Sequence, residues 1–186
     1  CFMQAPFWKA EGGRRVELMR DFDAVVEACG ALGVEFVVVP LVDNGRLDGQ
    51  TQEDDLVATL GEMAPSLSAR RVKVVFECDY KPSELERLMD RFDPSIFGVN
   101  YDIGNSAALG LDPEEELRSY GERILNVHVK DRLLGGTTVL LGTGNADFEK
   151  VFAGLGALEY RGNYIMQTAR AHDGLHAAVL QKYRNM

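Results

Sequence analysis

Apolar positions along the chain follow two spacings, one typical of helices and one typical of buried strands. From Arg14 to Leu32 apolar residues recur every three or four positions, which predicts an amphipathic helix that ends at Gly33. From Phe36 to Val42 the chain is continuously apolar and rich in β-branched residues, as expected for a strand buried on both faces. The same alternation repeats to the end of the chain.

The remaining segments are predicted in the same way. Further helices are expected at Thr51–Leu67, Pro82–Phe92, Pro113–Tyr120, Asp147–Gly154 and Leu175–Tyr183. Further strands are expected at Val72–Cys78, Ile96–Asp102, Ile124–Lys130 and Tyr164–Gln167, with a strand stub at Cys1–Met3. Ser83 is a candidate cap for the second of these helices, and Asp112 with Pro113 opens the third.

Strict alternation of strands and helices predicts an α/β fold with a parallel sheet and right-handed crossovers. Two architectures satisfy it, an open doubly wound sheet and a closed eight-stranded barrel. No glycine-rich dinucleotide fingerprint follows the early strands, which weakens the open-sheet alternative. Periodicity alone does not choose between the two.

Composition narrows the functional classes. With 186 residues and 46% hydrophobic content the chain can form a sizeable core, and its length suggests one domain. The net charge of −9, without a basic cluster, argues against nucleic acid as a partner. Three cysteines without a C-x-x-C pair favour a reducing cytoplasm, and no apolar run is long enough to span a membrane. Because Cys1 begins within strand-like sequence, we expect the natural protein to extend further towards its N-terminus.

Polar residues end four successive apolar strands. They are Glu77, Asp102, His128 and Gln167. In a parallel barrel the carboxyl ends of the strands converge on one face, where active sites lie. Each residue alone is more often a helix cap, a solvated loop residue or a hydrogen-bonded structural residue. Four in succession are harder to attribute to chance, and together they could hold a divalent ion.

Short motifs around these residues resemble the xylose-isomerase-like barrel family, which includes sugar-phosphate isomerases, ketose epimerases and endonuclease IV. The matching segments are Phe76–Glu77, Tyr101–Asn105, Asn126–Asp131, Leu141–Phe148 and Tyr160–Ile165. The resemblance implies that residues 1–186 form a single (β/α)8 TIM-barrel domain, N-terminally incomplete and lacking roughly its first two βα units.

The resemblance also implies a metal site. The family's Glu, Asp and His ligands fall on Glu77, Asp102 and His128, and its final Glu falls on Gln167. The expected cofactor is a divalent ion: Mn, Mg, Co or Zn. Gln167 offers an oxygen but no charge, so weaker metal binding than in relatives is expected. Glu77 is then the strong base of the set, which favours one-base isomerisation over two-base epimerisation, unless Asp131 compensates.

Substrate contacts are predicted beside the metal ligands. Asn105 stands where family members have a sugar-contacting His or Asn. Lys130, Arg132 and Arg170 are candidate anion contacts near the same strand ends. The turn Gly142–Asn145 precedes a helix and could bind phosphate. The alternatives are that its glycines serve only the turn and that Lys130 pairs with a nearby acid.

These residues predict an isomerase or epimerase that acts on a sugar or sugar phosphate through an enediolate. The alternative is a non-catalytic or weakly catalytic sugar-binding relative, because Gln replaces the usual final Glu. A DNA-repair endonuclease of the same fold would need a histidine-rich zinc cluster, and the chain has only 3 His. The expected partner is a small-molecule sugar or sugar phosphate rather than nucleic acid or a membrane, and the chain is a candidate homo-oligomer.

Overall fold

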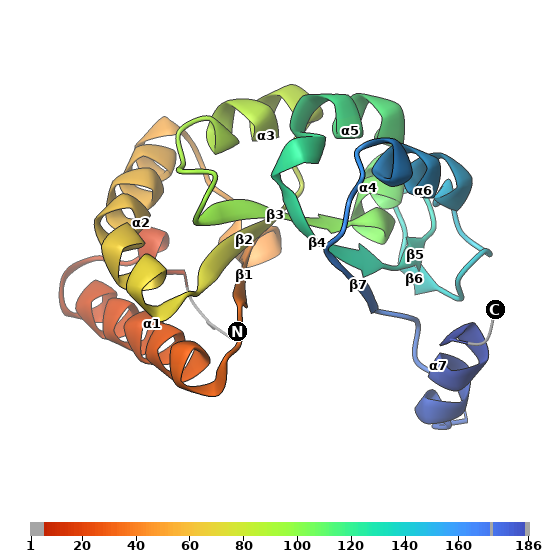
Figure 1. Cartoon of the computed structure of the whole chain (residues 1–186), viewed down its shortest axis with the longest axis horizontal. Helices are drawn as coiled ribbons and strands as arrows, with labels where there is room; N and C mark the ends of the chain where they lie inside the picture. The colour runs from red at the N-terminus through yellow and green to blue at the C-terminus, as the bar shows by residue number, and fades with distance from the viewer. Residues whose placement is uncertain (1–5, 172, 185–186) are drawn as a thin grey trace. The chain divides into compact units, whose positions relative to one another are not determined.

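The computed structural model describes residues 6–171 and 173–184 (Figure 1). The first half contains η1 (Phe7–Lys9), α1 (Gly12–Leu32), β1 (Phe36–Leu41), η2 (Asp43–Gly45), α2 (Gln50–Arg70), β2 (Lys73–Cys78) and α3 (Pro82–Met89). The second half contains β3 (Phe97–Asp102), α4 (Ile103–Leu109), α5 (Pro113–Tyr120), η3 (Gly121–Arg123), β4 (Ile124–Val129), β5 (Asp131–Arg132), β6 (Thr138–Val139), α6 (Phe148–Ala157), β7 (Asn163–Met166) and α7 (His176–Arg184). The predicted alternation is confirmed.

Five strands form one sheet in the order β1-β2-β3-β4-β7. β1 and β2 pair in parallel from Phe36↔Lys73 to Leu41↔Cys78, and β4 pairs in parallel with β7. The predicted parallel α/β sheet is therefore confirmed. The expected strand stub at Cys1–Met3 lies outside the described residues.

One local prediction is wrong, and two local features were missed. Ser83 lies inside α3 rather than capping it, because the helix begins at Pro82. The short helix α4 and the hairpin of β5 and β6 were not predicted. Seven residues make too few turns to show a helical period, and strands of two residues show no alternation.

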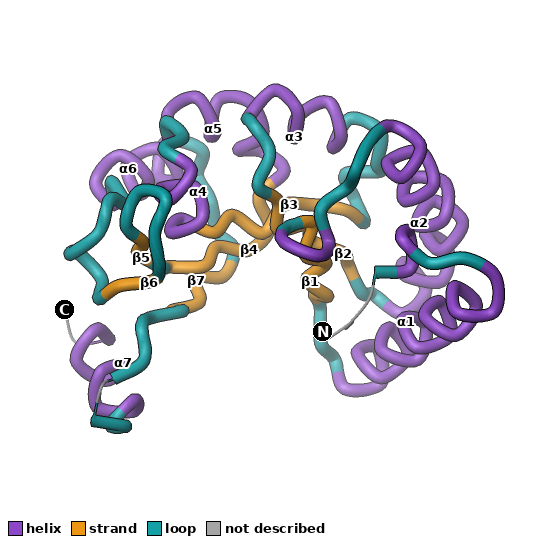
Figure 2. The backbone as a smooth tube through the Cα atoms, turned by 180° about the vertical axis from the view of Figure 1, so that it is seen from behind, coloured by secondary structure: helices purple, strands orange, loops and turns teal. Residues whose placement is uncertain are grey.

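The first compact unit comprises the described residues up to Tyr80 together with Glu84–Val99. In it α1 and α2 lie side by side (Figures 1 and 2). Arg15 on α1 joins them by donating to both carboxylate oxygens of Asp55 on α2, at 2.6 and 2.8 Å. Since Leu56 and Leu60 of α2 are fully buried, the helix pair is held by apolar packing with one bidentate ion pair at its edge.

A buried carboxylate connects α2 to α3 in the same unit. Glu53 receives two hydrogen bonds from Arg87, at 2.7 and 2.6 Å, and one from Arg91 at 2.5 Å. The hydrogen bond from Arg87 holds the pKa of Glu53 below its usual value, against the opposing effect of burial. Glu53 and Arg87 are therefore both charged at neutral pH, and their hydrogen bonds hold α3 against α2.

The second compact unit comprises Lys81–Ser83 and the chain from Asn100 onwards. Gly154 on α6 packs so closely on α5 that an added Cβ would lie 2.3 Å from Leu117 Cδ1. Asp147 caps α6 by accepting from the backbone N–H of Lys150 at 3.0 Å. In the described part of the chain, every helix is too short or too polar to cross a membrane.

Candidate metal and substrate site

Asp102 ends β3 and opens α4, and its two carboxylate oxygens have different partners. Oδ1 accepts a hydrogen bond of 2.8 Å from the backbone N–H of Asn105, which makes Asp102 the N-cap of α4. Oδ2 lies 3.6 Å from His128 Nδ1 and 3.3 Å from Lys130 Nζ. One oxygen therefore builds the strand-to-helix corner, while the other faces the polar end of β4.

His128 on β4 is oriented by two buried amides. The Nδ2 group of Asn126 donates to Asn100 Oδ1 at 2.5 Å, and Asn100 Nδ2 lies 3.2 Å from His128 Nδ1. With its Oδ1 occupied by Asn126, Asn100 donates through Nδ2, so the ring accepts at Nδ1 and carries its proton on Nε2. Asn100 and Asn126 were not predicted as site residues, although each stands two positions before a predicted ligand on the same strand face.

Two cations hold the amide of Asn105. Lys130 Nζ lies 3.2 Å and Arg132 Nη1 lies 2.9 Å from Asn105 Oδ1. Arg132 also donates to the carbonyl of Gly136 through Nε and Nη2, at 3.1 and 2.7 Å. The structure thus brings Asn105, Lys130 and Arg132 together, and it confirms that Lys130 pairs with a nearby acid, Asp102.

Gln167 and Arg170 meet Lys130 at a second feature, which we call the threonine pocket. It has a volume of about 650 Å³ and is lined by Lys130, Thr137, Thr138, Val139, Leu140, Thr143, Gln167, Thr168, Ala169 and Arg170. The backbone N–H of Gln167 donates to Val129 O at 3.0 Å, which ties the segment after β7 to the end of β4. The lining contains four threonine hydroxyls, the cations of Lys130 and Arg170, and the amide of Gln167, and it contains no acidic residue. Such a lining suits a polyol that carries negative charge. β6 contributes Thr138 and Val139 to one wall.

The glycine turn after β6 is organised by Asp131. This carboxylate is 1% exposed and accepts from the backbone N–H groups of Gly142, Gly144 and Ala146 at 2.9, 2.8 and 3.0 Å. A Cβ on Gly144 would lie 2.2 Å from Asp131 Oδ1. The turn's donors are therefore used within the protein, which supports turn geometry over phosphate binding as the reason for these glycines.

Glu77 stands near the carboxyl end of β2 in the first unit. Its neighbour Phe76 pairs with Val99 on β3, and Glu77 itself pairs with Pro40 on β1. The side chain is half-buried. Each candidate thus lies at or near the carboxyl end of its own strand: Glu77 on β2, Asp102 on β3 and His128 on β4.

Comparison with known proteins identifies the family. The model of the xylose isomerase-like TIM barrel family matches residues 1–183. The chain belongs to this family. Its parallel sheet and alternating helices agree with that fold.

Relatives and solved structures support this assignment. The chain is 31% identical over 122 residues to an inosose dehydratase of Geobacillus kaustophilus, a match covering 54% of this chain and 40% of that protein. It is 27% identical over 172 residues to an inosose dehydratase of Clostridium tetani, covering 77% and 57%. The chain therefore spans about half the length of these relatives.

Two solved structures share the fold at low identity. A zinc-bound IolI protein has a TM-score of 0.80 at 18% identity, covering 95% of this chain and 70% of that one. A xylose isomerase domain protein from Planctomyces limnophilus has a TM-score of 0.77 at 19% identity, covering 92% and 64%. At such identities the likeness shows the fold.

Proposed function

We propose that this xylose isomerase-like chain is part of a divalent-metal-dependent enzyme that isomerises or epimerises a sugar or sugar phosphate. The observation that carries the proposal is a pair of potential metal ligands within the second unit: Asp102 Oδ2 and His128 Nδ1 lie 3.6 Å apart. Glu77, at the end of β2 in the first unit, is proposed as the third ligand. The relatives named as inosose dehydratases and the fold neighbour named as zinc-bound IolI support sugar chemistry and a divalent ion.

The donor set fits such an ion. Two carboxylates and a neutral imidazole suit Mn, Mg, Co or Zn, and two negative charges balance one divalent cation. His128 Nδ1 lies 3.6 Å from Asp102 Oδ2, and a bound ion would take this nitrogen in place of the hydrogen bond from Asn100. Gln167 is proposed as a fourth ligand through its amide oxygen, in place of the family's final Glu. When bound, such an ion supplies Lewis-acid polarisation of a substrate carbonyl.

The chain's own residues perform the remaining steps. We assign proton removal next to the carbonyl to Glu77, which leads to an enediolate. Asp131 does not compensate as a second base, because three backbone N–H groups occupy its carboxylate. Isomerisation, in which one base moves the proton along one face, is therefore favoured over two-base epimerisation.

Substrate binding is assigned to the threonine pocket and its surroundings. Lys130 and Arg170 line this pocket and would attract an anionic group of the sugar. Arg132 is proposed to act through Asn105, whose amide oxygen it holds at 2.9 Å. Orientation of that amide fixes which sugar hydroxyl Asn105 can recognise.

A sugar-binding protein with little or no turnover is the second candidate. The neutral Gln167 at the place of the family's Glu favours it, because a shell with less negative charge binds a cation more weakly. Metal binding and turnover separate the two candidates, since sugar binding alone requires neither.

The test measures Mn²⁺ binding by calorimetry and turnover on a panel of ketoses, ketose phosphates and inososes, with the full-length protein. Asp102→Asn and His128→Ala should each abolish Mn²⁺ binding. Glu77→Gln should keep part of the binding but lower turnover by about 10²–10⁴, the usual cost of losing a general base. Asp112→Asn is the matched control, because Asp112 caps α5 by accepting from Glu114 at 3.1 Å and Asn caps equally well. If the wild-type protein binds none of Mn²⁺, Mg²⁺, Co²⁺ and Zn²⁺, the sugar-binding candidate becomes the better supported of the two.

A further inference from the structure

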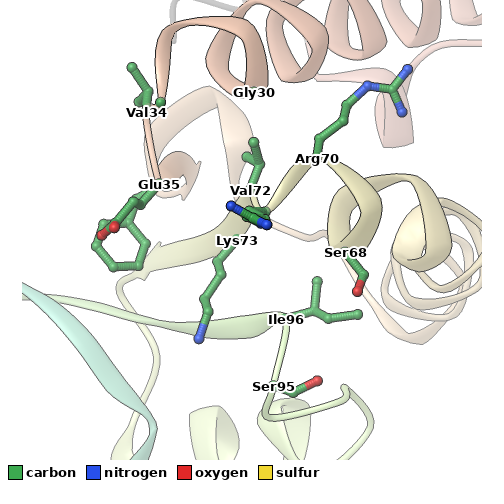
Figure 3. Close-up of a pocket in the computed structure, with 12 residues that line it drawn as sticks. Gly30, Val34, Glu35, Ser68, Arg70, Val72, Lys73, Ser95 and Ile96 are labelled. Atoms are coloured by element: carbon green, nitrogen blue, oxygen red, sulfur yellow. The ribbon is translucent and has the colours of Figure 1, made fainter.

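A second pocket lies within the first compact unit, at the amino ends of β1, β2 and β3 (Figure 3). We call it the amino-end pocket. Its volume is about 720 Å³, within the range of small-molecule sites. It is lined by Gly30, Gly33, Val34, Glu35, Phe36, Ser68, Arg70, Arg71, Val72, Lys73, Ser95 and Ile96. Lys73 begins β2 and Glu77 is four residues further along it, so this pocket and the proposed metal ligand occupy opposite ends of the strand.

The lining carries an excess of positive charge. Three basic residues, Arg70, Arg71 and Lys73, face one acid, Glu35. Arg70 turns its guanidinium away from the pocket and donates to the Ser66 hydroxyl (Figure 3). Lys73 extends into it, and in the described part of the chain neither Lys73 nor Arg71 has a side-chain hydrogen bond or ion pair. Two cations are thus available to a ligand.

Arg71 is held in a conformation that its side chain disfavours. It ends α2 in the left-handed region with φ 58°, where Gly33 ends α1 with φ 70° beside the same pocket. Glycine adopts this conformation without steric cost, whereas a residue with a Cβ does not. Arg71 therefore places a guanidinium group in the lining at a backbone position where glycine would avoid the steric strain.

The ends of α1 and α2 do not need these cations as hydrogen-bond donors. The backbone N–H of Gly33 bonds the Gly30 carbonyl, and that of Arg71 bonds the carbonyls of Leu67 and Ser68. Favourable interaction with the α2 dipole is the simplest alternative role for Arg71. An interaction with the helix dipole does not account for the pocket or for the presence of Lys73 in it.

We propose that the amino-end pocket binds the anionic group of a small molecule, a phosphate or a carboxylate, through Arg71 and Lys73. The hydroxyl of Ser68 adds a neutral donor to this lining, and Glu35 disfavours ligands with several dispersed negative charges. This site is independent of the proposed sugar chemistry.

The test is a titration of the metal-free full chain with inorganic phosphate and, separately, with the monocarboxylate acetate, followed by amide NMR. Residue-resolved shifts distinguish the two pockets: Lys73, Ser68 and Ser95 report the amino-end pocket, and Thr138 and Arg170 report the threonine pocket. Binding of phosphate but not acetate identifies a phosphoryl site, and the reverse identifies a carboxylate site.

Arg71→Gly separates ligand binding from fold. It should weaken the anion by about tenfold or more, the effect of one lost charge-assisted contact. Its free energy of unfolding should not fall, because glycine relieves the left-handed strain. Lys73→Gln should weaken binding similarly, while Arg20→Ala, on an exposed position of α1, should not. Unchanged affinity in Arg71→Gly, or no shift at Lys73 with either anion, would overturn the proposal.

Discussion

The ammonium group of Lys130 lies 3.3 Å from Oδ2 of Asp102, the carboxylate oxygen that also faces His128. Both side chains are largely buried, so this charge is weakly screened by solvent. A cation bound by Asp102 would experience repulsion from Lys130. Lys130 therefore orients the carboxylate and would lower the affinity of the proposed site for a metal ion.

Replacing Lys130 by Met should tighten Mn²⁺ binding. The substitution keeps a long apolar stem and removes the competing charge, and we expect about a tenfold gain, equivalent to about 1.4 kcal/mol. Calorimetry on the full-length protein measures it. Lys150→Met is the control, because Lys150 is exposed and lies 3.7 Å from Glu114, outside the proposed site. Weaker binding in Lys130→Met would instead show that Asp102 needs Lys130 for its orientation.

Arg170→Ala should weaken a phosphorylated ligand more than its unphosphorylated parent. Arg170 lines the threonine pocket, and one charge-assisted contact contributes about 1.5–3 kcal/mol. Arg161→Ala is the control, an exposed arginine absent from that lining. Arg132→Ala should instead affect both ligands, because its bonds to Asn105 and Gly136 hold the wall of the site. Equal losses for both ligands in Arg170→Ala would make Arg170 structural.

Glu116 is a buried carboxylate of α5 surrounded by hydroxyl groups. It accepts from Tyr101 at 2.9 Å, from Tyr120 at 2.7 Å and from Ser106. Burial raises the pKa of Glu116 above its usual value of 4.5, although the hydroxyl groups partly oppose the effect. Because its partners adjoin Asp102 and Asn105 in sequence, Glu116 supports the corner between β3 and α4.

The raised pKa gives Glu116 a defined effect on stability. A group whose folded pKa is raised favours the folded state fully at low pH and loses that contribution as pH rises through the folded pKa. Glu116→Gln cannot ionise, so its free energy of unfolding should improve relative to wild type between pH 4.5 and neutrality. Urea denaturation of both proteins at pH 4 and pH 7 measures the difference. If the stability advantage of Glu116→Gln over wild type decreases as pH rises, this assignment is contradicted.

Asp131→Asn should loosen the turn that contains Gly142 and Gly144. One oxygen of Asp131 accepts from both of those N–H groups, and an amide nitrogen placed there could not accept. The free energy of unfolding should fall by about 1–3 kcal/mol, the cost of leaving buried donors unsatisfied. Limited proteolysis should detect new cleavage in the turn. Asp147→Asn is the control, since Asn remains a good cap for α6. Equal stability of the two variants would count against this role of Asp131.

The amino-acid sequence by itself determined the order and nature of most elements. Runs such as Phe36–Val42 are apolar and β-branched, and apolar residues recur every three or four positions in the helix that ends at Gly33, so local sequence predicts both elements. All the predicted helices and strands with described counterparts have ends within three residues of those observed. Polar residues at the strand ends also marked Glu77, Asp102 and His128 as candidates, because a parallel sheet collects such ends on one side.

Tertiary structure decided which groups each candidate contacts. Lys130 and Arg132 both contact Asn105, although they lie 25 and 27 positions after it in the sequence. No local sequence pattern encodes such contacts. The same holds for the three amide donors of Asp131 and the hydroxyl partners of Glu116. Side-chain spacing reports which face of an element is apolar, whereas hydrogen bonds and charge pairs depend on packing between elements distant in sequence. The strand ends were therefore predictable, but the electrostatic environment of each became known only from the folded chain.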